Sequence, residues 1–194
     1  MASKPVVSGM VAPRASASSR DEASLIAEAR AGDREAQEAL IAAYLTDVYE
    51  VAVRVLGDRD LAQDAAQDAI VNALAGLPRF RGDSSFRTWL LRITVNSARS
   101  LGRRRWRKRE VAIEAAEMQP STERDPATMA AIRDEAGRVA LLLERLPPKQ
   151  RLAVSLRVNQ GLSYQEIGSI LDCSDGAARV NYHLGIKRLR EWMS

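Results

Sequence analysis

Cysteine and histidine are almost absent from this sequence, and that scarcity excludes several kinds of site. Cys173 and His183 are the only residues of their types among the 194. A single cysteine cannot form an internal disulfide, and one Cys with one His cannot supply the ligands of a structural zinc site. We therefore expect no disulfide, no bound metal and no cofactor.

The elements of a hydrolytic active site are missing as well. The chain has no glycine-rich phosphate loop ending in Lys followed by Ser or Thr, and it offers no base and nucleophile pair. A DNA-cleaving enzyme would need an activated Ser or Tyr among clustered acid or base partners, and no such cluster is visible. We predict that the protein is not an enzyme.

Aromatic residues, glycines and long apolar runs are also scarce. Aromatic residues make up 5% of the chain and 11 residues are glycine, which favours an all-α protein over a β-sandwich. No apolar run approaches the roughly twenty residues that cross a bilayer, and no signal-peptide core is present. We expect a cytoplasmic protein without membrane insertion.

Positive charge is concentrated in one place. The net charge is only +4, but six of the seven residues from Arg103 to Arg109 are Arg or Lys. A partner that carries phosphates is the main expectation, and a membrane surface is the weaker alternative. Trp106, the exception in this run, could stack on nucleic acid or on a neighbouring helix, and the sequence does not choose between them.

Apolar spacing divides the chain into four parts. A Ser, Ala and Pro-rich tail without a period is expected to be disordered, because it has no apolar face to bury. Two helical parts follow, separated by a linker that contains Pro120 and Pro126. The expected tail, first domain, flexible linker and second domain are residues 1–20, 21–109, 110–132 and 133–194.

The third predicted helix, which ends near Gly76, has two different faces. One carries small apolar residues, and the other carries Asp60, Asp64, Gln67 and Asp68. A solvated acidic face is the plain interpretation, and spacing alone favours it. The alternative is a docking face for a basic helix, because clustered carboxylates steer such encounters.

A long helix is predicted after the loop that begins at Phe80. Ser84 and Ser85 are suitable N-cap residues, and no proline follows before Arg109. The helix would be about 37 Å long, enough to lie along roughly ten base pairs of DNA. Its apolar stripe, which includes Phe86 and Trp89, is expected to be core. A displaced face carries Arg92, Asn96, Arg99 and Arg103.

A helix-turn-helix is predicted near the C-terminus. Ser163 and Glu166 form a capping box, and Asp172 to Ser174 make a short turn before a second helix. In such motifs the second helix enters the major groove of DNA. We expect packing inward at Ala178, Tyr182, Gly185 and Leu189, and DNA contacts at Arg179, Asn181, His183, Lys187 and Arg190.

Together these motifs resemble the extracytoplasmic-function (ECF) sigma factors of bacterial RNA polymerase, in the sigma-70 family. The resemblance covers nearly all of residues 25–192 and rests on the order and spacing of several fragments. These are Gly32-Asp33, Tyr44 with Val48-Tyr49, Ala62 to Asp68, Phe80-Arg81-Gly82, Thr88-Trp89-Leu90 with Ile93 and Asn96, Leu146-Pro147-Pro148, and Gly161 to Ile167.

The resemblance implies two domains and three partners. The first domain would be sigma region 2, a helical bundle, and the second would be region 4, a helix-turn-helix. The implied partners are core RNA polymerase, promoter DNA as duplex and as melted non-template strand, and an anti-sigma factor. The implied activity is recognition of the minus-thirty-five and minus-ten elements with nucleation of DNA melting.

The resemblance also assigns roles to residues. It favours the docking interpretation for the acidic face, so Asp64, Gln67 and Asp68 would bind the basic coiled coil of the polymerase clamp. The implied minus-ten contacts, beside a loop that captures a flipped base, are Phe80, Arg81, Ser84, Arg92, Asn96, Arg99 and Arg103. The implied minus-thirty-five contacts are Ser174, Asp175, Gly176, Arg179, Asn181, His183 and Lys187.

Several positions depart from the family pattern. Gln63 stands where Glu is more common, and Asn181 stands where many members have a second basic residue. Asn reads adenine whereas Arg prefers guanine, so an unusual minus-thirty-five preference is expected. Leu184 and Ile186 replace arginines, and an alternative is that they face a protein partner. The remaining functional alternative is a helix-turn-helix regulator that works without polymerase and dimerises through its first domain.

Overall fold

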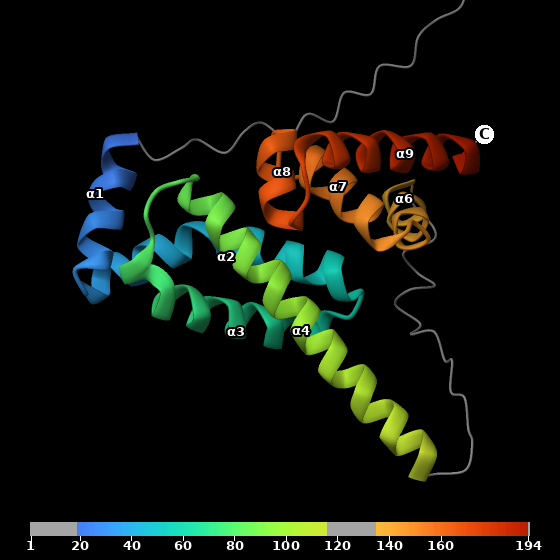
Figure 1. The fold of residues 1–194 in the computed structure, drawn as a ribbon, viewed down its shortest axis with the longest axis horizontal. Coiled ribbons are helices and arrows are strands. Elements are labelled where there is room, and N and C mark those ends of the chain that lie inside the picture. Colours follow the sequence, from blue (N-terminus) through green and yellow to red (C-terminus); the bar gives the residue numbers. More distant parts are fainter. Residues whose placement is uncertain (1–18, 116–134, 194) are drawn as a thin grey trace, which may run out of the picture.

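The computed structural model describes residues 19–115 and 135–193, and within these ranges it contains helices and no strand (Figure 1). The all-α prediction is confirmed for this part of the chain. The expected tail and linker lie mostly outside it. The helices are α1 (Ser19–Arg30), α2 (Arg34–Leu56), α3 (Arg59–Gly76), the short 3-10 helix η1 (Leu77–Arg79), α4 (Phe86–Ala115), α6 (Glu135–Glu144), α7 (Pro148–Val158), α8 (Tyr164–Leu171) and α9 (Asp175–Met193).

Local side-chain caps account for most helix starts. Asp33 accepts a hydrogen bond from the Ala36 amide at 2.8 Å and so caps α2, and Asp58 caps α3 in the same way. Ser163 and Glu166 form the predicted capping box of α8. Each cap satisfies amides that the first helical turn leaves unpaired. α4 continues to Ala115, six residues beyond the expected domain end.

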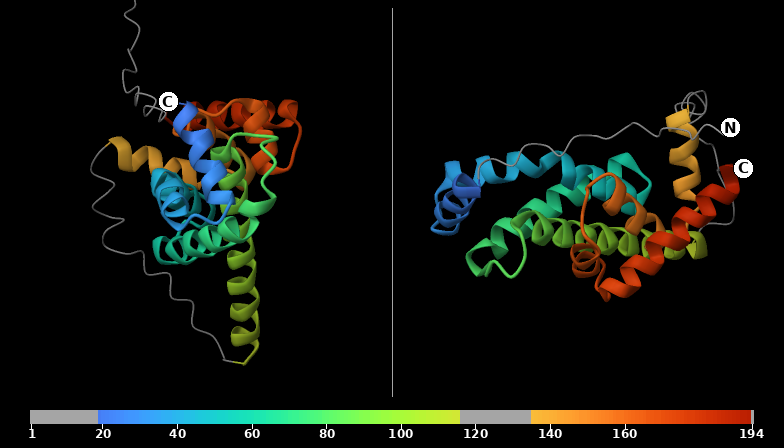
Figure 2. Two further views of the ribbon diagram at one scale, coloured as in Figure 1. Left: turned by 90° about the vertical axis from the view of Figure 1, so that its left-hand side faces the viewer. Right: turned by 90° about the horizontal axis from the view of Figure 1, so that it is seen from above.

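The first domain is a bundle in which α2, α3 and α4 pack together and α1 crosses one end (Figures 1 and 2). Five alanines of α3 are buried, which lets α2 and α4 approach closely. The predicted core role of Phe86 and Trp89 is confirmed, because Phe86 is 2% exposed and Trp89 packs against the same cluster.

The second domain is built from α6, α7, α8 and α9. Ala178, Gly185 and Leu189 are buried, as the spacing predicted, and Tyr182 is half-buried. A Cβ at Gly185 would lie 2.6 Å from Cγ2 of Val154, so glycine is needed where α9 crosses α7.

The two domains are packed against each other. Leu91 and Val95 of α4 and Val51 of α2 belong to one buried cluster with Leu156 and Ile167 of the second domain. In Figure 1 and in the left view of Figure 2 the second domain lies against α2 and α4, on the side away from α3. The sequence predicted two domains but gave no sign of this shared core.

Candidate functional site

The acidic face of α3 is exposed. Asp64, Gln67 and Asp68 all lie at the surface, on the side of the helix opposite its buried alanines. Val71 continues this face at helical spacing and is 65% exposed. Sequence reasoning missed Val71, although its distance of seven residues from Asp64 could have revealed it. The face therefore combines carboxylates, an amide and one apolar side chain.

One carboxylate of this face is already paired within the chain. Oδ2 of Asp68 lies 3.2 Å from Nη2 of Arg104, and both side chains are about half exposed. Arg104 belongs to the basic run of α4. An exposed ion pair of this kind is weak and readily exchanged, because solvent screens it.

The predicted cationic face of α4 is confirmed as a surface. Arg92, Asn96 and Arg103 are exposed and Arg99 is half-buried. Their spacing places them along one side of the helix. No observation tests whether this face contacts DNA, so that role stays a prediction.

Phe80 is buried, whereas a base-stacking role needs an exposed ring. It is 6% exposed, and its ring centroid lies 5.0 Å from that of Trp89 and 5.8 Å from that of Phe86. In this packing Phe80 is a core residue, and stacking on an extruded base would require its ring to leave the cluster, so that role stays a prediction. Arg81 is exposed and Ser84 is half-buried in the same loop, and both stay predicted contacts.

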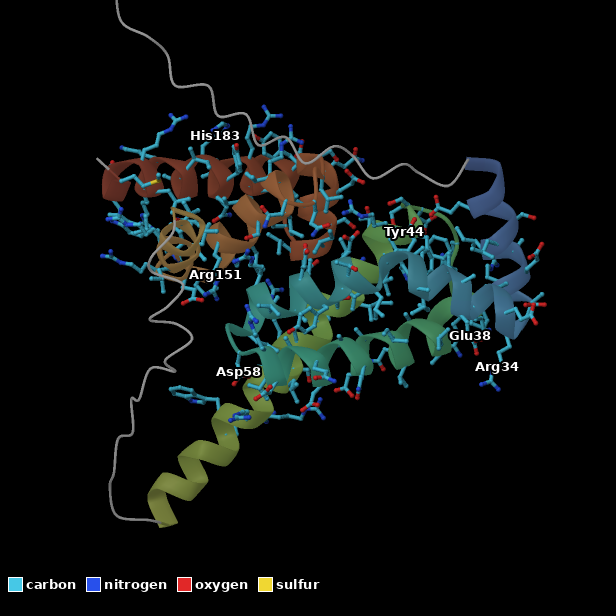
Figure 3. All side chains as sticks on the ribbon, turned by 180° about the vertical axis from the view of Figure 1, so that it is seen from behind. Arg34, Glu38, Tyr44, Asp58, Arg151 and His183 are labelled. Atoms are coloured by element: carbon cyan, nitrogen blue, oxygen red, sulfur yellow. The ribbon has the colours of Figure 1, made fainter. Side chains whose placement is uncertain are left out.

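The outer side of α9 gathers the predicted helix-turn-helix residues. Ser174, Asp175, Gly176, Arg179, His183 and Lys187 are exposed. Figure 3 shows His183 on the outer side of the second domain, away from the helices of the first. Ser174 also caps α9, since its Oγ accepts from the Ala177 amide at 3.1 Å.

Asn181 is less available than its neighbours. It is half-buried, and its Nδ2 donates to the Ala177 carbonyl at 2.8 Å. Bidentate reading of adenine uses both the amide oxygen and the amide nitrogen. The side chain must therefore turn before it can read adenine in this way.

The two apolar substitutions on α9 behave differently. Leu184 is 44% exposed and shares a face with Val180, which is 57% exposed. Ile186 instead packs beside Leu143 and Leu189 in the core of the second domain. Only Leu184 is free to meet a partner as the sequence suggested.

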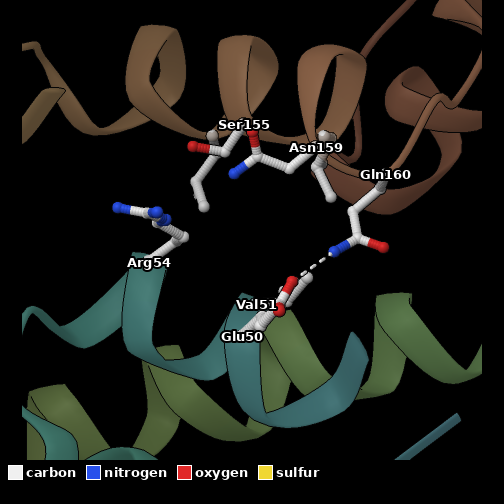
Figure 4. Close-up of a pocket in the computed structure, with 8 residues that line it drawn as sticks. Glu50, Val51, Arg54, Ser155, Asn159 and Gln160 are labelled. Carbon is white, nitrogen blue, oxygen red and sulfur yellow. Dashed lines mark hydrogen bonds between the residues drawn. The ribbon is translucent and has the colours of Figure 1, made fainter. Parts of the chain in front are cut away.

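The interface between the domains is polar at its edge. Arg87 of α4 donates from Nε to Asp47 Oδ2 at 2.7 Å, from Nη1 to the Gln160 carbonyl at 2.8 Å, and from Nη2 to Oε1 of Gln160. Thr88 donates to Glu166 Oε1 at 3.1 Å. Beside them, a small cleft between α2 and α7 is bridged by Gln160, whose Nε2 donates to Glu50 Oε2 at 3.1 Å (Figure 4).

Glu166 joins the capping box to this interface. Burial is the largest single influence on its pKa and acts to raise it. Hydrogen bonds from the Ser163 amide and hydroxyl and from Thr88, together with the charge of Arg87, outweigh burial and hold the pKa below its ordinary value. The carboxylate form therefore favours the capped start of α8, which Thr88 of α4 contacts.

The described residues hold neither a metal cluster nor a membrane span. No group of three or more His, Cys, Asp or Glu side chains there could hold a metal ion. None of the helices in residues 19–115 and 135–193 has the length and apolar character needed to cross a membrane.

Comparison with known proteins gives consistent matches. The family model for Sigma-70 region 2 matches residues 40–108, and that for Sigma-70, region 4 matches residues 136–189. RNA polymerase sigma-H factor of Pseudomonas aeruginosa is 34% identical over 163 residues, which cover 80% of this chain and 84% of that protein. ECF RNA polymerase sigma-E factor of Escherichia coli K12 is also 34% identical, with 80% and 85% covered.

Two solved structures resemble the fold. CnrH in complex with the cytosolic domain of CnrY has a TM-score of 0.67 at 25% identity, covering 89% of this chain and 96% of that one. The sigma factor RpoE in complex with the anti-sigma factor NepR, from Bartonella quintana, has a TM-score of 0.65 at 22% identity, covering 80% and 95%. The second likeness concerns the fold alone.

Proposed function

The chain belongs to the sigma-70 family of RNA polymerase sigma factors, within the ECF group, and from this premise we propose how its surfaces divide the work. The acidic face of α3 binds core polymerase, α4 and the loop before it engage the minus-ten element, and α9 reads the minus-thirty-five element. The protein acts in the cytoplasm as a specificity subunit without catalytic activity of its own. The observation that carries the proposal is that these surfaces lie on three different helices, so a partner bound to one of them does not cover the others.

Polymerase docking is supported by the charge and exposure of α3. Asp64 and Asp68 present carboxylates to solvent beside the exposed amide of Gln67. A basic helix gains both steering and hydrogen bonds from such a surface. Val71 adds apolar contact area at the end of the same face. These features suit the clamp coiled coil that the family resemblance implies.

Promoter melting must be driven by binding, since no hydrolytic step is proposed. Extruding a base costs a few kcal/mol, and stacking on side chains returns about 1 to 3 kcal/mol per base. Because Phe80 is buried, the loop offers its backbone and Arg81, while Asn96 and Arg92 lie on the adjoining helix face. Contacts from these side chains to the displaced strand would supply the rest of the free energy needed to extrude the base.

The packed domains cannot occupy both promoter elements at once. The names of the elements place them about 25 base pairs apart, on the order of 80 Å at about 3.4 Å per base pair. The whole of α4 is only about 45 Å long, and α8 is hydrogen-bonded to its first turn. Promoter binding therefore requires the second domain to leave α2 and α4.

An anti-sigma factor is a natural partner for the packed arrangement. The family resemblance implies such a factor, and CnrH, which is 25% identical to this chain, was solved in complex with the cytosolic domain of CnrY. We propose that a comparable protein binds this chain and holds it inactive. Membership of the family decides against the helix-turn-helix regulator that works without polymerase.

The proposed function is tested with purified core polymerase and a library of genomic DNA fragments. The wild-type chain should bind core polymerase and direct transcription from a subset of fragments. Asp64→Arg should weaken polymerase binding but leave binding of minus-thirty-five duplex DNA intact, whereas Glu38→Arg, an exposed acid of α2, should change neither. A chain that neither binds core polymerase nor directs transcription would refute the proposal. Equal loss of both activities in Asp64→Arg would refute the role of α3.

A further inference from the structure

An aromatic ring at the start of the helix-turn-helix lies against an arginine of the recognition helix. Tyr164 opens α8, and its ring centroid is 5.1 Å from Cζ of Arg179 in α9. We propose that Tyr164 is a positioning residue, which holds the Arg179 guanidinium ready to read guanine in the minus-thirty-five element. This inference rests on the proposed function and adds to it a residue that recognises no base itself.

The ring is fixed by the elements around it. Tyr164 follows Ser163, the N-cap of α8, whose capping box sets the start of the helix. Tyr182 of α9 packs beside it with ring centroids 5.8 Å apart. Arg157 also stacks on the ring at 5.0 Å, and its Nη1 donates to the Leu162 carbonyl at 2.7 Å. The platform is therefore built before DNA arrives.

The two arginines on this ring differ in which of their hydrogen-bond donors remain available. Nη1 of Arg157 donates a hydrogen bond to the backbone of the turn before α8. Arg179 is exposed, and its guanidinium makes no hydrogen bond or ion pair within residues 19–115 and 135–193. A guanidinium stacks through its face and donates through its edge, so the stack leaves the edge that binds guanine O6 and N7 available.

Ordering the side chain before binding is the expected benefit. A free arginine has many rotamers and must lose them when it binds a base. An exposed cation–π contact stabilises one of these orientations enough to change an affinity by about two- to fivefold. The effect should appear in sequence discrimination, because contacts to phosphates do not depend on Arg179 pointing at a base edge.

The experiment uses the full chain in holoenzyme with core polymerase. The wild-type holoenzyme first selects its preferred duplex DNA from promoters randomised in the minus-thirty-five region. Discrimination is then the ratio of a holoenzyme's affinity for the selected element to its affinity for a scrambled element. Tyr164→Phe should keep the wild-type discrimination, since the ring remains. Tyr164→Leu should lower it about two- to fivefold without changing affinity for scrambled DNA. In an Arg179→Ala background, Tyr164→Leu should have no further effect.

A second measurement detects the stack in the protein without DNA. The Nε–H resonance of Arg179 should show an upfield ring-current shift in the wild type and Tyr164→Phe, and lose it in Tyr164→Leu. Equal losses from Tyr164→Leu with and without Arg179, or tighter binding by Tyr164→Leu, would overturn the inference. If Tyr164→Leu kept the wild-type discrimination, the inference about Tyr164 would be overturned and the proposed function would stand. If the wild-type holoenzyme discriminated no sequence, the proposed function would be overturned as well.

Discussion

Thr88 of α4 donates a hydrogen bond of 3.1 Å to Glu166 of α8, and so joins the helix proposed for minus-ten binding to the helix-turn-helix. Thr88 is 1% exposed, which places this bond inside the interface. Its neighbour Arg87 extends the link to Asp47 and Gln160. The packed arrangement is therefore held by specific polar contacts around an apolar centre, and it can be weakened by single substitutions.

Arg87→Ala should open the interface between the domains. The change removes three hydrogen bonds and leaves Asp47, whose side chain is 19% exposed, without its partner. The expected loss in the free energy of unfolding is about 1 to 3 kcal/mol, the range for a hydrogen-bonded charge that loses its partner. Small-angle scattering should show a larger radius of gyration.

The matched control is Arg34→Ala. Arg34 also pairs with an acid, Glu38, but both side chains are largely exposed and the pair lies within one helix. Its loss should change neither stability nor shape measurably, because exposed pairs contribute little. An unchanged radius of gyration in Arg87→Ala would contradict a clasping role for that residue.

The start of α8, which contacts Thr88, should loosen at acidic pH through Glu166. Its pKa in the folded chain lies below the ordinary value of 4.5, chiefly through the bonds of the capping box, so the carboxylate stabilises the folded start of α8 above that value. This contribution begins to be lost as the pH falls below 4.5 and is gone once the pH passes below the folded pKa. Amide exchange in α8 should accelerate over this window. Glu166→Gln keeps a side chain that can cap α8 but does not titrate. Amide exchange in this variant should therefore not accelerate over the same pH window.

Local features were predictable from sequence, whereas long-range ones were not. The capping box of Ser163 and Glu166 spans three residues, so its pattern is visible without any fold. Arg87 meets partners 40 and 73 residues away, and no local spacing records such pairing. Phe80 lies in a loop between helices, where no period assigns a side chain to core or surface, so its burial could not be predicted from spacing.

Arg104→Gln should increase affinity for core polymerase. The substitution frees Asp68 from an intramolecular cation and leaves both of its oxygens available to a basic partner helix. The gain should stay below about fivefold, because an exposed ion pair contributes at most about 1 kcal/mol. Fluorescence anisotropy with labelled chain measures this affinity.

Arg105→Gln provides the comparison for Arg104. Arg105 is exposed in the same basic run and forms no ion pair with any of the described residues. The Arg105→Gln substitution removes the same charge without releasing Asp68, so affinity for core polymerase should stay at the wild-type value. If Arg104→Gln and Arg105→Gln raised the affinity for core polymerase equally, the cause would be the change in net charge and not the release of Asp68.

Phe80→Leu should separate a core role from a base-stacking role. Phe80 is buried against Phe86 and Trp89, so an apolar replacement that fills much of the same volume should cost no more than about 1.5 kcal/mol of stability. Phe80→Ala should cost about 3 to 5 kcal/mol, since it leaves a cavity. Promoter opening, followed by permanganate reactivity of unpaired thymines, should persist in Phe80→Leu. If opening were lost while the melting temperature of the protein held, Phe80 would have to leave the core and meet the base directly.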